Sequence, residues 1–493
     1  MEEISEQTKQ RLTKLQKIKA KGENPYPNDF FPSVTAQKLH SQYDAHTRET
    51  LENNKETFSM AGRVLGVRAF GKAAFLQLQD RTGKIQAYVA QDLLGEEAFK
   101  AFMELMDIGD IVGICGSPFK TKTNELTLKT TSARVLSKCL HPLPEKWHGL
   151  QDIETRYRQR YLDLIVNPKV KEVFQVRSKL IQEIRNFFIA RDYLEVETPM
   201  MHPIAGGALA KPFVTHHNTL DMDLYLRIAP ELYLKRLVVG GLERVFEINR
   251  NFRNEGISIQ HNPEFTMIEF YEAYATYDRL MNLTEELIVH LAKSVLGKEE
   301  ITYQGETIYL KKPWARYTLK ESVLKFTDFK EKDLDDPKKI ISYLEKERVN
   351  LPLNRELGYL QTALFEAAVE KKLIQPTFIY QYPLAVSPLS RKNDQDSQYV
   401  DRFELYIYGR EMANAFSELN DPMDQKERFL KQMEGKASGD EESHEMDEDY
   451  VRALEYGMPP TAGEGIGIDR LVMLFTDSPS IRDVILFPQL KKV

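Results

Sequence analysis

Five short, closely spaced strand-like segments set one stretch of the chain apart from the rest. They cover residues 59–67, 74–78, 84–89, 111–116 and 125–131. Turns that contain glycine and aspartate separate them, and a single helical pattern occupies residues 94–105. Five strands with one helix are typical of a small closed β-barrel of the OB type.

A positive patch is expected on this barrel. Residues 120–138 contain five basic side chains and one acid, Glu125, although the whole chain has a formal net charge of −7. Single-stranded nucleic acid binds surfaces on which positive charge lies beside aromatic rings. The barrel segment therefore predicts a nucleic-acid partner that the total charge conceals.

The sequence on either side of the barrel predicts two further parts. Before it, a helical pattern mixed with lysines ends at Gly22 and the Pro25-Tyr26-Pro27 breaker. We interpret these lysines as a solvated helix face, with phosphate contacts to a nucleic acid as the alternative. After a proline-containing linker at 141–144, the rest of the chain forms one mixed unit of helices and strands. We expect a helical extension over residues 1–50, a barrel domain over 51–145 and a large domain over 146–493.

The composition excludes several classes of protein. A chain of 493 residues is long enough for several domains, and it contains no run of about 18 apolar residues, so we expect no membrane span. The first residues lack the apolar region of a secretory signal, which favours a cytoplasmic location. Two cysteines are too few for a multi-cysteine zinc site, so we expect no zinc and a metal held by oxygen.

Two segments of the large unit offer the chemistry of a nucleotide site. The chain contains neither a GxxxxGK[ST] loop nor a strand-bounded GxGxxG motif, so arginines and a metal would have to hold a triphosphate. Arginines that could hold a triphosphate occur in Arg250-Asn251-Phe252-Arg253-Asn254-Glu255-Gly256, which is followed by residues 261–265. They occur again in Gly463-Glu464-Gly465-Ile466-Gly467-Ile468-Asp469-Arg470.

At these residues the chain resembles the class II aminoacyl-tRNA synthetases, and in detail the bacterial-type lysyl-tRNA synthetases. The resemblance spans nearly the whole chain, with motif 1 at residues 172–199, motif 2 at 245–269 and motif 3 at 465–470. It implies an α+β protein with an N-terminal OB-fold barrel that binds the anticodon. A C-terminal synthetase domain, with an antiparallel sheet flanked by helices, would follow. It also implies a homodimer that forms through motif 1.

The resemblance assigns an ATP site and a magnesium site. Arg253 and Arg470 are the implied catalytic residues, and the implied ATP-binding set is Arg253, Glu255, His261, Phe265 and Arg470. Arg470 and Phe265 would enclose the adenine between them. Glu411 and Glu418 match the magnesium pair of the family. Because a spacing of seven puts two residues on opposite faces of a regular strand, we expect a turn or bulge between them.

The resemblance also assigns a lysine site and an anticodon site. The implied lysine-binding residues are Gly207, Glu231, Glu269, Tyr271, Asn414 and Glu418. The implied anticodon-binding residues are Arg68, Phe75, Gln86 and Glu125, and the RNA partner would be tRNA(Lys). An acidic pocket fits a substrate that carries a distant ammonium group, because a buried ammonium group is costly unless it is paired.

Three alternatives remain open from the residues alone. An aspartyl- or asparaginyl-tRNA synthetase would share the barrel and the three motifs, but its pocket should contain cations rather than Glu231 and Glu269. A lysine-activating paralogue that modifies a translation factor would lack the barrel. A non-catalytic RNA-binding protein with a synthetase fold would have no need of Arg253, Arg470, Glu411 and Glu418.

Overall fold

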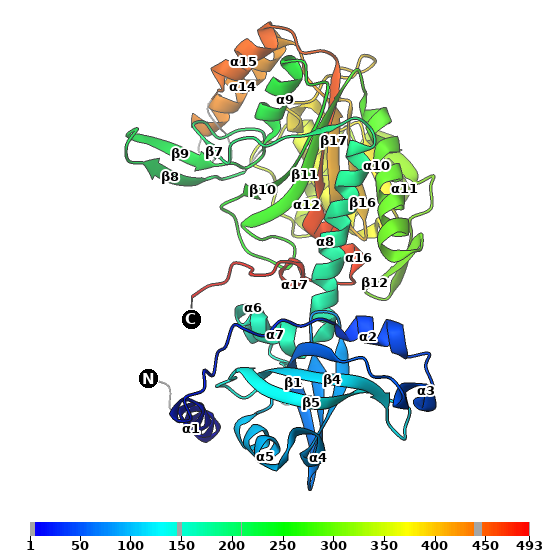
Figure 1. Cartoon of the computed structure of the whole chain (residues 1–493). Coiled ribbons are helices and arrows are strands. Elements are labelled where there is room, and N and C mark those ends of the chain that lie inside the picture. The colour runs from blue at the N-terminus through cyan, green and yellow to red at the C-terminus, as the bar shows by residue number, and fades with distance from the viewer. Residues whose placement is uncertain (1–4, 145–149, 209, 438–445, 493) are drawn as a thin grey trace. The chain divides into compact units, whose positions relative to one another are not determined.

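The computed structural model describes residues 5–144, 150–208, 210–437 and 446–492. Within it the chain forms two compact units, Met1–Gln151 and Asp152–Val493, which are treated separately below (Figure 1). The expected division at residues 50 and 145 stays a prediction. Among the described residues, no helix is both long and apolar enough to cross a membrane.

The first unit is built around a closed five-stranded barrel, as the sequence predicts. The strands are β1 Phe58–Phe70, β2 Ala73–Gln79, β3 Lys84–Ala90, β4 Ile111–Lys120 and β5 Leu126–Ser137, in the order β1-β2-β3-β5-β4. Alternate residues point inward, so Met60, Val64 and Leu76 are fully buried in the barrel core. The remaining helices of this unit are α1 Glu6–Ala20, α2 Ala36–Tyr43, α3 Arg48–Glu52, α4 Gln91–Leu94 and α5 Glu96–Leu105.

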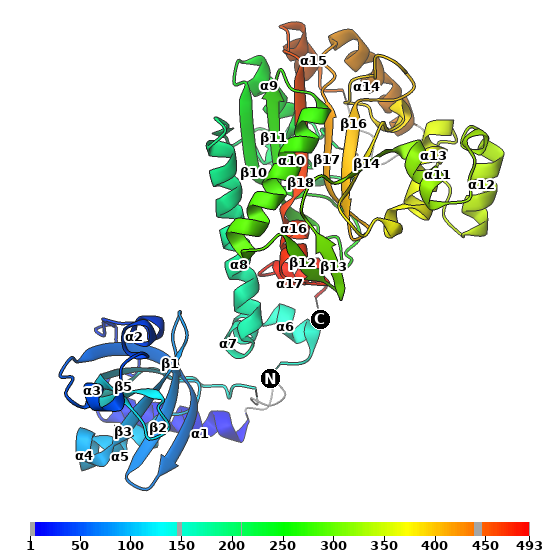
Figure 2. The same cartoon turned by 90° about the vertical axis from the view of Figure 1, so that its right-hand side faces the viewer.

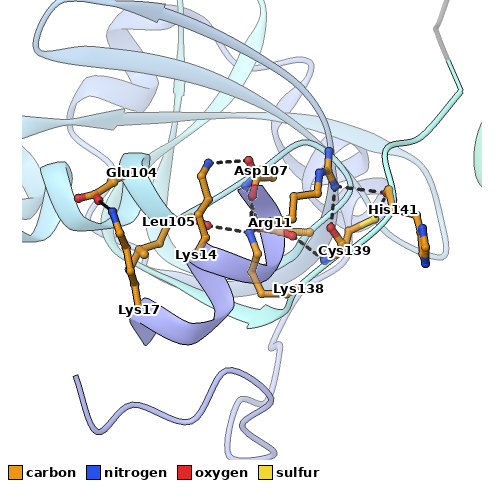
Figure 3. A network of polar contacts seen from close by, with 10 residues as sticks. Arg11, Lys14, Lys17, Glu104, Leu105, Asp107, Lys138, Cys139 and His141 are labelled. Atoms are coloured by element: carbon orange, nitrogen blue, oxygen red, sulfur yellow. Dashed lines mark hydrogen bonds and ion pairs between the residues drawn. The ribbon is translucent and has the colours of Figure 1, made fainter. Parts of the chain in front are cut away.

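Helix α1 uses part of its positive charge to dock on the barrel unit (Figure 3). Lys14 Nζ lies 2.6 Å from Asp107 Oδ1, and Lys17 Nζ lies 2.7 Å from Glu104 Oε1. Arg11 donates to the backbone oxygen of Cys139 at 2.6 Å. These three residues therefore have an intramolecular role that neither interpretation from the sequence includes.

A buried ion network fixes the end of β5 against the segment that follows α5 (Figure 3). Lys138 Nζ donates to Asp107 Oδ2, Asp110 Oδ2 and the backbone oxygen of Leu105, each at 2.7 Å. The side chains of Lys138 and Asp110 are fully buried. Asp110 also accepts the backbone N–H of Cys139, so its charge is doubly compensated.

The second unit contains an eight-stranded sheet that carries the site. The strand order is β14-β15-β16-β17-β18-β11-β10-β6, with parallel pairing only in the outermost pairs, β14 with β15 and β10 with β6. The bounds are β6 Leu194–Glu195, β10 Arg244–Phe252, β11 Glu264–Ala273, β14 Ala315–Thr318, β15 Thr377–Tyr380, β16 Arg402–Ile407, β17 Arg410–Ser417 and β18 Thr461–Gly467. The mainly antiparallel sheet and the barrel confirm the expected α+β fold.

Three helices cover one face of this sheet and bury the main core. They are α8 Pro168–Ile189, α10 Tyr277–Leu291 and α16 Ile468–Phe475, and Figure 2 shows α8 and α10 against the central strands. Their apolar side chains pack on alternate residues of the sheet, such as Ile268 and Phe270 on β11. The other face of β11 and its neighbours is left for the cavity described below.

The remaining elements of the second unit surround this sheet. Helices α11 Leu319–Phe326, α12 Pro337–Lys346 and α13 Leu357–Ala368 lie together in Figure 2, and their apolar side chains form a separate cluster with Ile379 of β15. Helix α9 Glu231–Val239 packs on β10 and β11, and α15 Glu448–Glu455 packs on α9. The others are α6 Ile153–Arg158, α7 Arg160–Val166, β7 Met201–His202, β8 Phe213–His217, β9 Met222–Leu226, η1 Ala292–Leu296, β12 Glu300–Tyr303, β13 Glu306–Tyr309, η2 Glu331–Asp333, η3 Glu370–Lys372, η4 Leu384–Val386, α14 Pro422–Ala437 and α17 Ile481–Val484.

Lys138→Met should destabilise the first unit strongly, because it leaves Asp110 buried without its counter-ion. Breaking a buried ion pair from one side costs about 3–5 kcal/mol. Unfolding of the full chain by urea, followed by circular dichroism, measures the change. Lys14→Met is the matched control, because Lys14 contacts the same Asp107 but is 28% exposed, and exposed pairs contribute at most about 1 kcal/mol. Equal losses from the two variants would contradict this account of the network.

Candidate active site

A cavity of about 450 Å³ lies on the open face of the central strands in the second unit. Of the residues assigned to the ATP, magnesium and lysine sites, it is lined by Gly207, Glu231, Arg253, Glu255, His261, Phe265, Glu269, Tyr271, Glu411, Asn414 and Arg470. Glu418 is the only member of those sets that does not line it. The structure therefore brings together, in one hollow, residues that lie up to 263 positions apart, from Gly207 to Arg470.

Strand pairing explains why the cavity lies here. Phe265, Met267, Glu269 and Tyr271 alternate along β11 and so share one face. Glycines of β18 lie opposite them in register, with Gly465 facing Glu269 and Gly463 facing Tyr271.

These glycines make room for side chains of β11 that line the cavity. A Cβ atom at Gly463 would lie 2.3 Å from a ring carbon of Tyr271, and one at Gly465 would lie 2.6 Å from the methyl carbon of Met267. Both distances are shorter than any normal contact between carbon atoms. Strand β18 therefore needs glycine at these two positions so that the side chains of β11 can lie over it.

One end of the cavity carries two arginines. The guanidinium of Arg253 lies 5.1 Å from the ring centre of Phe265. Arg470 donates to the backbone oxygen of Glu411 and lies 3.3 Å from its carboxylate. In the protein alone, Phe265 is therefore paired with Arg253, whereas Arg470 is paired with Glu411.

The other end of the cavity is acidic, and a fully buried cation that sequence reasoning missed lies beside it. Lys235 Nζ lies 2.6 Å from Glu231 Oε1 and also contacts Glu418 Oε2. The side chains of Lys235 and Glu418 are fully buried. Lys235 follows Glu231 by four residues on α9, a spacing at which helix side chains meet, and this was the available signal.

Glu411 and Glu418 are separated by the irregularity that the spacing predicts. In the pairing of β16 with β17, Leu405 lies opposite Ala413 but Tyr406 lies opposite Glu411, so β17 carries an extra residue there. Glu411 lines the cavity, whereas Glu418 follows the end of β17, with a carboxylate oxygen on the same side of Gly463 as the ring of Tyr271. Across the described ranges, no group of three or more histidine, cysteine or acidic side chains could hold a metal without further ligands.

The residues assigned to the anticodon lie on the barrel. Gln86 Nε2 donates to Glu125 Oε2 at 3.0 Å, and Arg68 lies opposite Phe75 in the pairing of β1 with β2. The ring of Phe75 is 5.2 Å from that of Tyr88.

The aromatic surface of the barrel is larger than the sequence suggested. Phe70 lies 5.5 Å from Phe75, and Phe119 lies 6.0 Å from Tyr88. The four rings Phe70, Phe75, Tyr88 and Phe119 are at least partly exposed, and we call them the aromatic strip. Sequence reasoning identified only Phe75, because the other rings come from different strands.

Comparisons with known proteins agree with this geometry. Family models for "tRNA synthetases class II (D, K and N)" and "OB-fold nucleic acid binding domain" match residues 152–491 and 58–136. The chain is 54% identical to the lysine–tRNA ligase of Carboxydothermus hydrogenoformans over 492 residues, which cover 99% of each chain. It is 56% identical to that of Nitrosomonas europaea over 484 residues, which cover 98% of this chain and 96% of the relative. The chain belongs to the class II tRNA synthetases, among the lysine–tRNA ligases. The resemblance stated from the sequence is thereby confirmed, and an aspartyl or asparaginyl identity is not favoured.

Burial shifts the ionisation of the acidic end of this synthetase's cavity. Burial, and then the neighbouring charge of Glu231, hold the pKa of Glu269 well above its usual range. Burial also raises the pKa of Glu231 and of Glu418. Burial alone would lower the pKa of Lys235, but the carboxylates of Glu231 and Glu418 raise it instead. The carboxyl groups therefore lack sufficient positive charge around them when no substrate is bound.

At the arginine end, burial lowers pKa values instead of raising them, because the groups there are positively charged when protonated. It lowers the pKa of Arg253, which still remains protonated at pH 7 because a guanidinium starts so high. Burial, and then the charge of Arg470, lower the pKa of His261. In the protein alone, His261 is consequently neutral at pH 7.

A further residue that the sequence did not identify holds motif 3 in place. Arg177 on α8 lies 2.5 Å from Asp469 Oδ1, and it also donates to the hydroxyl of Thr266 at 3.0 Å. The other carboxylate oxygen of Asp469 accepts the backbone N–H of Thr266 at 2.7 Å. One arginine of motif 1 therefore ties motif 2 to the residue immediately before Arg470.

Glu269→Gln should stabilise the substrate-free synthetase at about pH 8. An acid whose pKa is raised in the folded state keeps its proton at a pH where the unfolded chain has lost it, so the free energy of unfolding falls as the pH rises. The glutamine variant lacks this loss. Its gain in Tm should therefore be largest near pH 8 and become smaller as the pH falls toward 4.5, the ordinary pKa of a glutamate side chain. Thermal unfolding across this range measures the gain, and calorimetry should show weaker lysine binding.

Glu264→Gln is the control, because Glu264 lies on the same strand with its side chain 46% exposed. Glu264 forms an exposed ion pair with Arg250, so the effect of this variant on stability should stay within about 1 kcal/mol at every pH. A gain for Glu269→Gln that does not change with pH would show that Glu269 is ionised in the folded protein.

Proposed function

We propose that this synthetase activates L-lysine with ATP to lysyl-adenylate and then transfers lysine to the 3′ end of tRNA(Lys). The observation that carries the proposal is one cavity that joins a buried acidic end to an end with two arginines. A substrate with a cationic tail and a carboxylate fits the acidic end and the junction, and a triphosphate fits the arginines.

The first step needs positioning more than acid–base chemistry. At pH 7 the lysine carboxylate is already ionised and can attack the α-phosphorus without a general base. Arg253 would bridge that carboxylate and the α-phosphate, reducing the repulsion between two anions; a planar guanidinium suits this better than an ammonium group. Arg470 would bind the nucleotide from motif 3, with Phe265 against the adenine and Glu255 and His261 beside the phosphates.

A magnesium ion fits part of this site. Glu411 is a carboxylate at the cavity wall with its side chain 41% exposed, and Mg²⁺ binds through one or two carboxylates with phosphate oxygens and water. When bound, the ion would neutralise charge on the triphosphate. Glu411 is paired with Arg470 and Glu418 with Lys235, but Glu411 is partly exposed at the cavity whereas Glu418 is fully buried, so Glu411 is the stronger candidate of the two.

The charges at the acidic end match those of lysine. Glu231, Glu269 and Glu418 supply three carboxyl groups, and Lys235 balances one of them. Two negative charges then remain for the two ammonium groups of the substrate, and Arg253 meets its carboxylate. Gly207 has a φ of +88°, and a Cβ atom built on it would lie 3.1 Å from the Cβ atom of Glu231. A glycine at this position would let the backbone approach the substrate. Tyr271 and Asn414 complete the lysine-binding set.

The barrel supports recognition of tRNA(Lys) through its anticodon. Unpaired bases stack on aromatic rings, and their edges are identified by hydrogen bonds. The aromatic strip offers successive rings, and Gln86 and Glu125 form a hydrogen-bonded pair, with Thr127 donating to Gln86 Oε1 at 3.0 Å. Arg68 supplies a positive charge next to Phe75.

We further propose that the synthetase is a homodimer. Apolar side chains are exposed at the end of α8 and on the short strands after it, including Ile189, Leu194, Met201 and Val214 at 52–60%. Exposed apolar side chains that cluster on neighbouring elements are typical of a protein–protein interface. The cytoplasmic location and the helical extension over residues 1–50 stay predictions.

Pyrophosphate exchange with a panel of amino acids tests the function. Lysine should support exchange best, because it satisfies all the charges of the cavity. Ornithine should exceed alanine, because one methylene group is worth only about 1–3 kcal/mol of discrimination. Aspartate and asparagine should give none. Exchange with aspartate, or no exchange with any amino acid, would support the aspartyl-type or the non-catalytic alternative respectively.

Phe75→Ala should raise the apparent KM for tRNA and leave pyrophosphate exchange nearly unchanged. Base stacking on an aromatic ring is worth about 1–3 kcal/mol, which corresponds to a rise of about fivefold to a hundredfold. Aminoacylation and exchange assays measure the two effects. Phe31→Ala is the control, because Phe31 is a highly exposed ring of the same unit outside the aromatic strip. Loss of both activities in Phe75→Ala would make Phe75 a folding residue.

A further inference from the structure

Arg402 on β16 has a position in the cavity wall that none of the motifs explains. Its guanidinium is directed at three different parts of the second unit. Nε donates to Asn414 Oδ1 at 3.0 Å, one terminal nitrogen donates to Ser387 Oγ at 2.8 Å, and the other donates to Glu404 Oε1 at 2.5 Å. Arg402 lies 4.7 Å over the ring of Tyr382, which fixes the plane of the guanidinium.

The pairing of β16 with β17 builds this arrangement. Glu404 lies directly opposite Asn414, and Arg402 lies opposite Phe416. Residues two apart on a strand share a face, so these side chains all point toward the cavity, which they line. Glu404 also accepts the hydroxyls of Tyr382 and Tyr406, so the carboxylate that holds Arg402 is itself held.

Arg402 decides which end of the Asn414 amide faces the cavity. A guanidinium group can donate hydrogen bonds but cannot accept them. The amide atom of Asn414 that faces it must therefore be the oxygen, and the NH₂ group points elsewhere. Within the part of the chain that the structure describes, no group accepts a hydrogen bond from Asn414 Nδ2, and Asn414 lines the cavity.

An NH₂ group aimed into this cavity selects the chemistry of its partner. The two ammonium groups of lysine have no lone pair to offer, so they cannot accept its hydrogen bond. A carboxylate oxygen can. The donor at Asn414 therefore fits the carboxylate end of the substrate, at a place distinct from the acidic end around Glu231.

We propose that Arg402 is a positioning residue for amino-acid activation: it fixes the amide of Asn414 as a hydrogen-bond donor to the substrate carboxylate. This inference rests on the proposed function, and it adds a residue that acts through Asn414 without touching the substrate. The same guanidinium donates to the backbone oxygen of Val386 and to Ser387, so it also ties the 386–390 wall of the cavity to β17.

A double-mutant cycle tests the coupling between the two residues. Arg402→Lys keeps the positive charge beside Glu404 but cannot make all three contacts, so the KM for lysine should rise at least about tenfold. The KM for ATP should change by less than about threefold, since no contact of Arg402 involves the arginine end. In an Asn414→Ala background, Arg402→Lys should add little further loss. Additive losses would overturn the proposal, because they would show a general structural role.

Arg428→Lys is the matched control for that cycle. Arg428, on α14, is also partly buried, and it donates to the backbone oxygens of Ser387 and Ser390, but it does not contact Asn414. Its effect should therefore be additive with Asn414→Ala. Coupling of the same size for Arg428→Lys would overturn the specific link between Arg402 and Asn414.

Asn414→Asp tests the direction of the hydrogen bond even if the Arg402 variants fail to fold. Aspartate replaces the NH₂ group with an oxygen of nearly the same size. If Asn414 donates to the substrate carboxylate, the variant should raise the KM for lysine by at least about tenfold, because two anions then face each other. An unchanged or lower KM would show that an ammonium group lies there, and the proposal would be wrong.

These results separate the inference from the function on which it rests. If the unmodified synthetase shows no lysine-dependent pyrophosphate exchange, the proposed function fails and no variant is needed. If exchange with lysine is normal while the cycle is additive or Asn414→Asp binds lysine well, only the role of Arg402 fails. Thermal unfolding of each variant, measured without substrate, identifies losses that come from instability alone.

Discussion

The cavity depends on one constraint, which is that buried carboxyl groups must be compensated. Glu231, Glu269 and Glu418 come from α9, β11 and the end of β17, and all three are withdrawn from water. Lys235 supplies one positive charge, and the substrate would supply the others. A site built in this way is stable without substrate only because protons can take the place of the missing cations, which is why the carboxyl pKa values are raised. The same buried carboxyl groups then account both for the selectivity of the cavity for a cationic amino acid and for the lower stability of the protein without it.

The space for this chemistry comes from backbone that carries no side chains. Gly463 and Gly465 lie on the central strand β18, where Tyr271 and Met267 occupy the room that Cβ atoms would need. Neighbouring helices hold the strand from the other side, through apolar packing and through the contact of Arg177 with Asp469. Glycine is costly in the interior of a strand. It is tolerated here because β18 is paired along both edges, with β11 and β17, and a pre-formed cavity needs no rearrangement when the charged groups meet.

The sequence predicts this site unevenly, for a physical reason. The barrel strands, the three motifs and the irregularity in β17 could be recognised because each is a local pattern: alternation, glycine spacing, or a spacing that cannot fit a regular strand. Lys235 shows a local signal only in retrospect. Arg402, Arg177 and the three rings of the aromatic strip other than Phe75 had none, because each acquires its role from a strand or helix far away in the sequence. Register between distant strands decides those contacts, and single-sequence patterns do not contain it.

The three cations that sequence reasoning missed have a common feature, which is that the fold already satisfies them before any substrate arrives. Lys235 is held by two glutamates, Arg402 by Glu404, whose carboxylate also accepts two tyrosine hydroxyls, and Arg177 by Asp469. Arg253 differs, since its buried Nε has no hydrogen-bond partner among the described residues. An unsatisfied buried donor is unfavourable in the protein alone and becomes favourable when an anion arrives. The satisfied cations therefore hold the walls in place, and the unsatisfied one is left to bind the reacting groups.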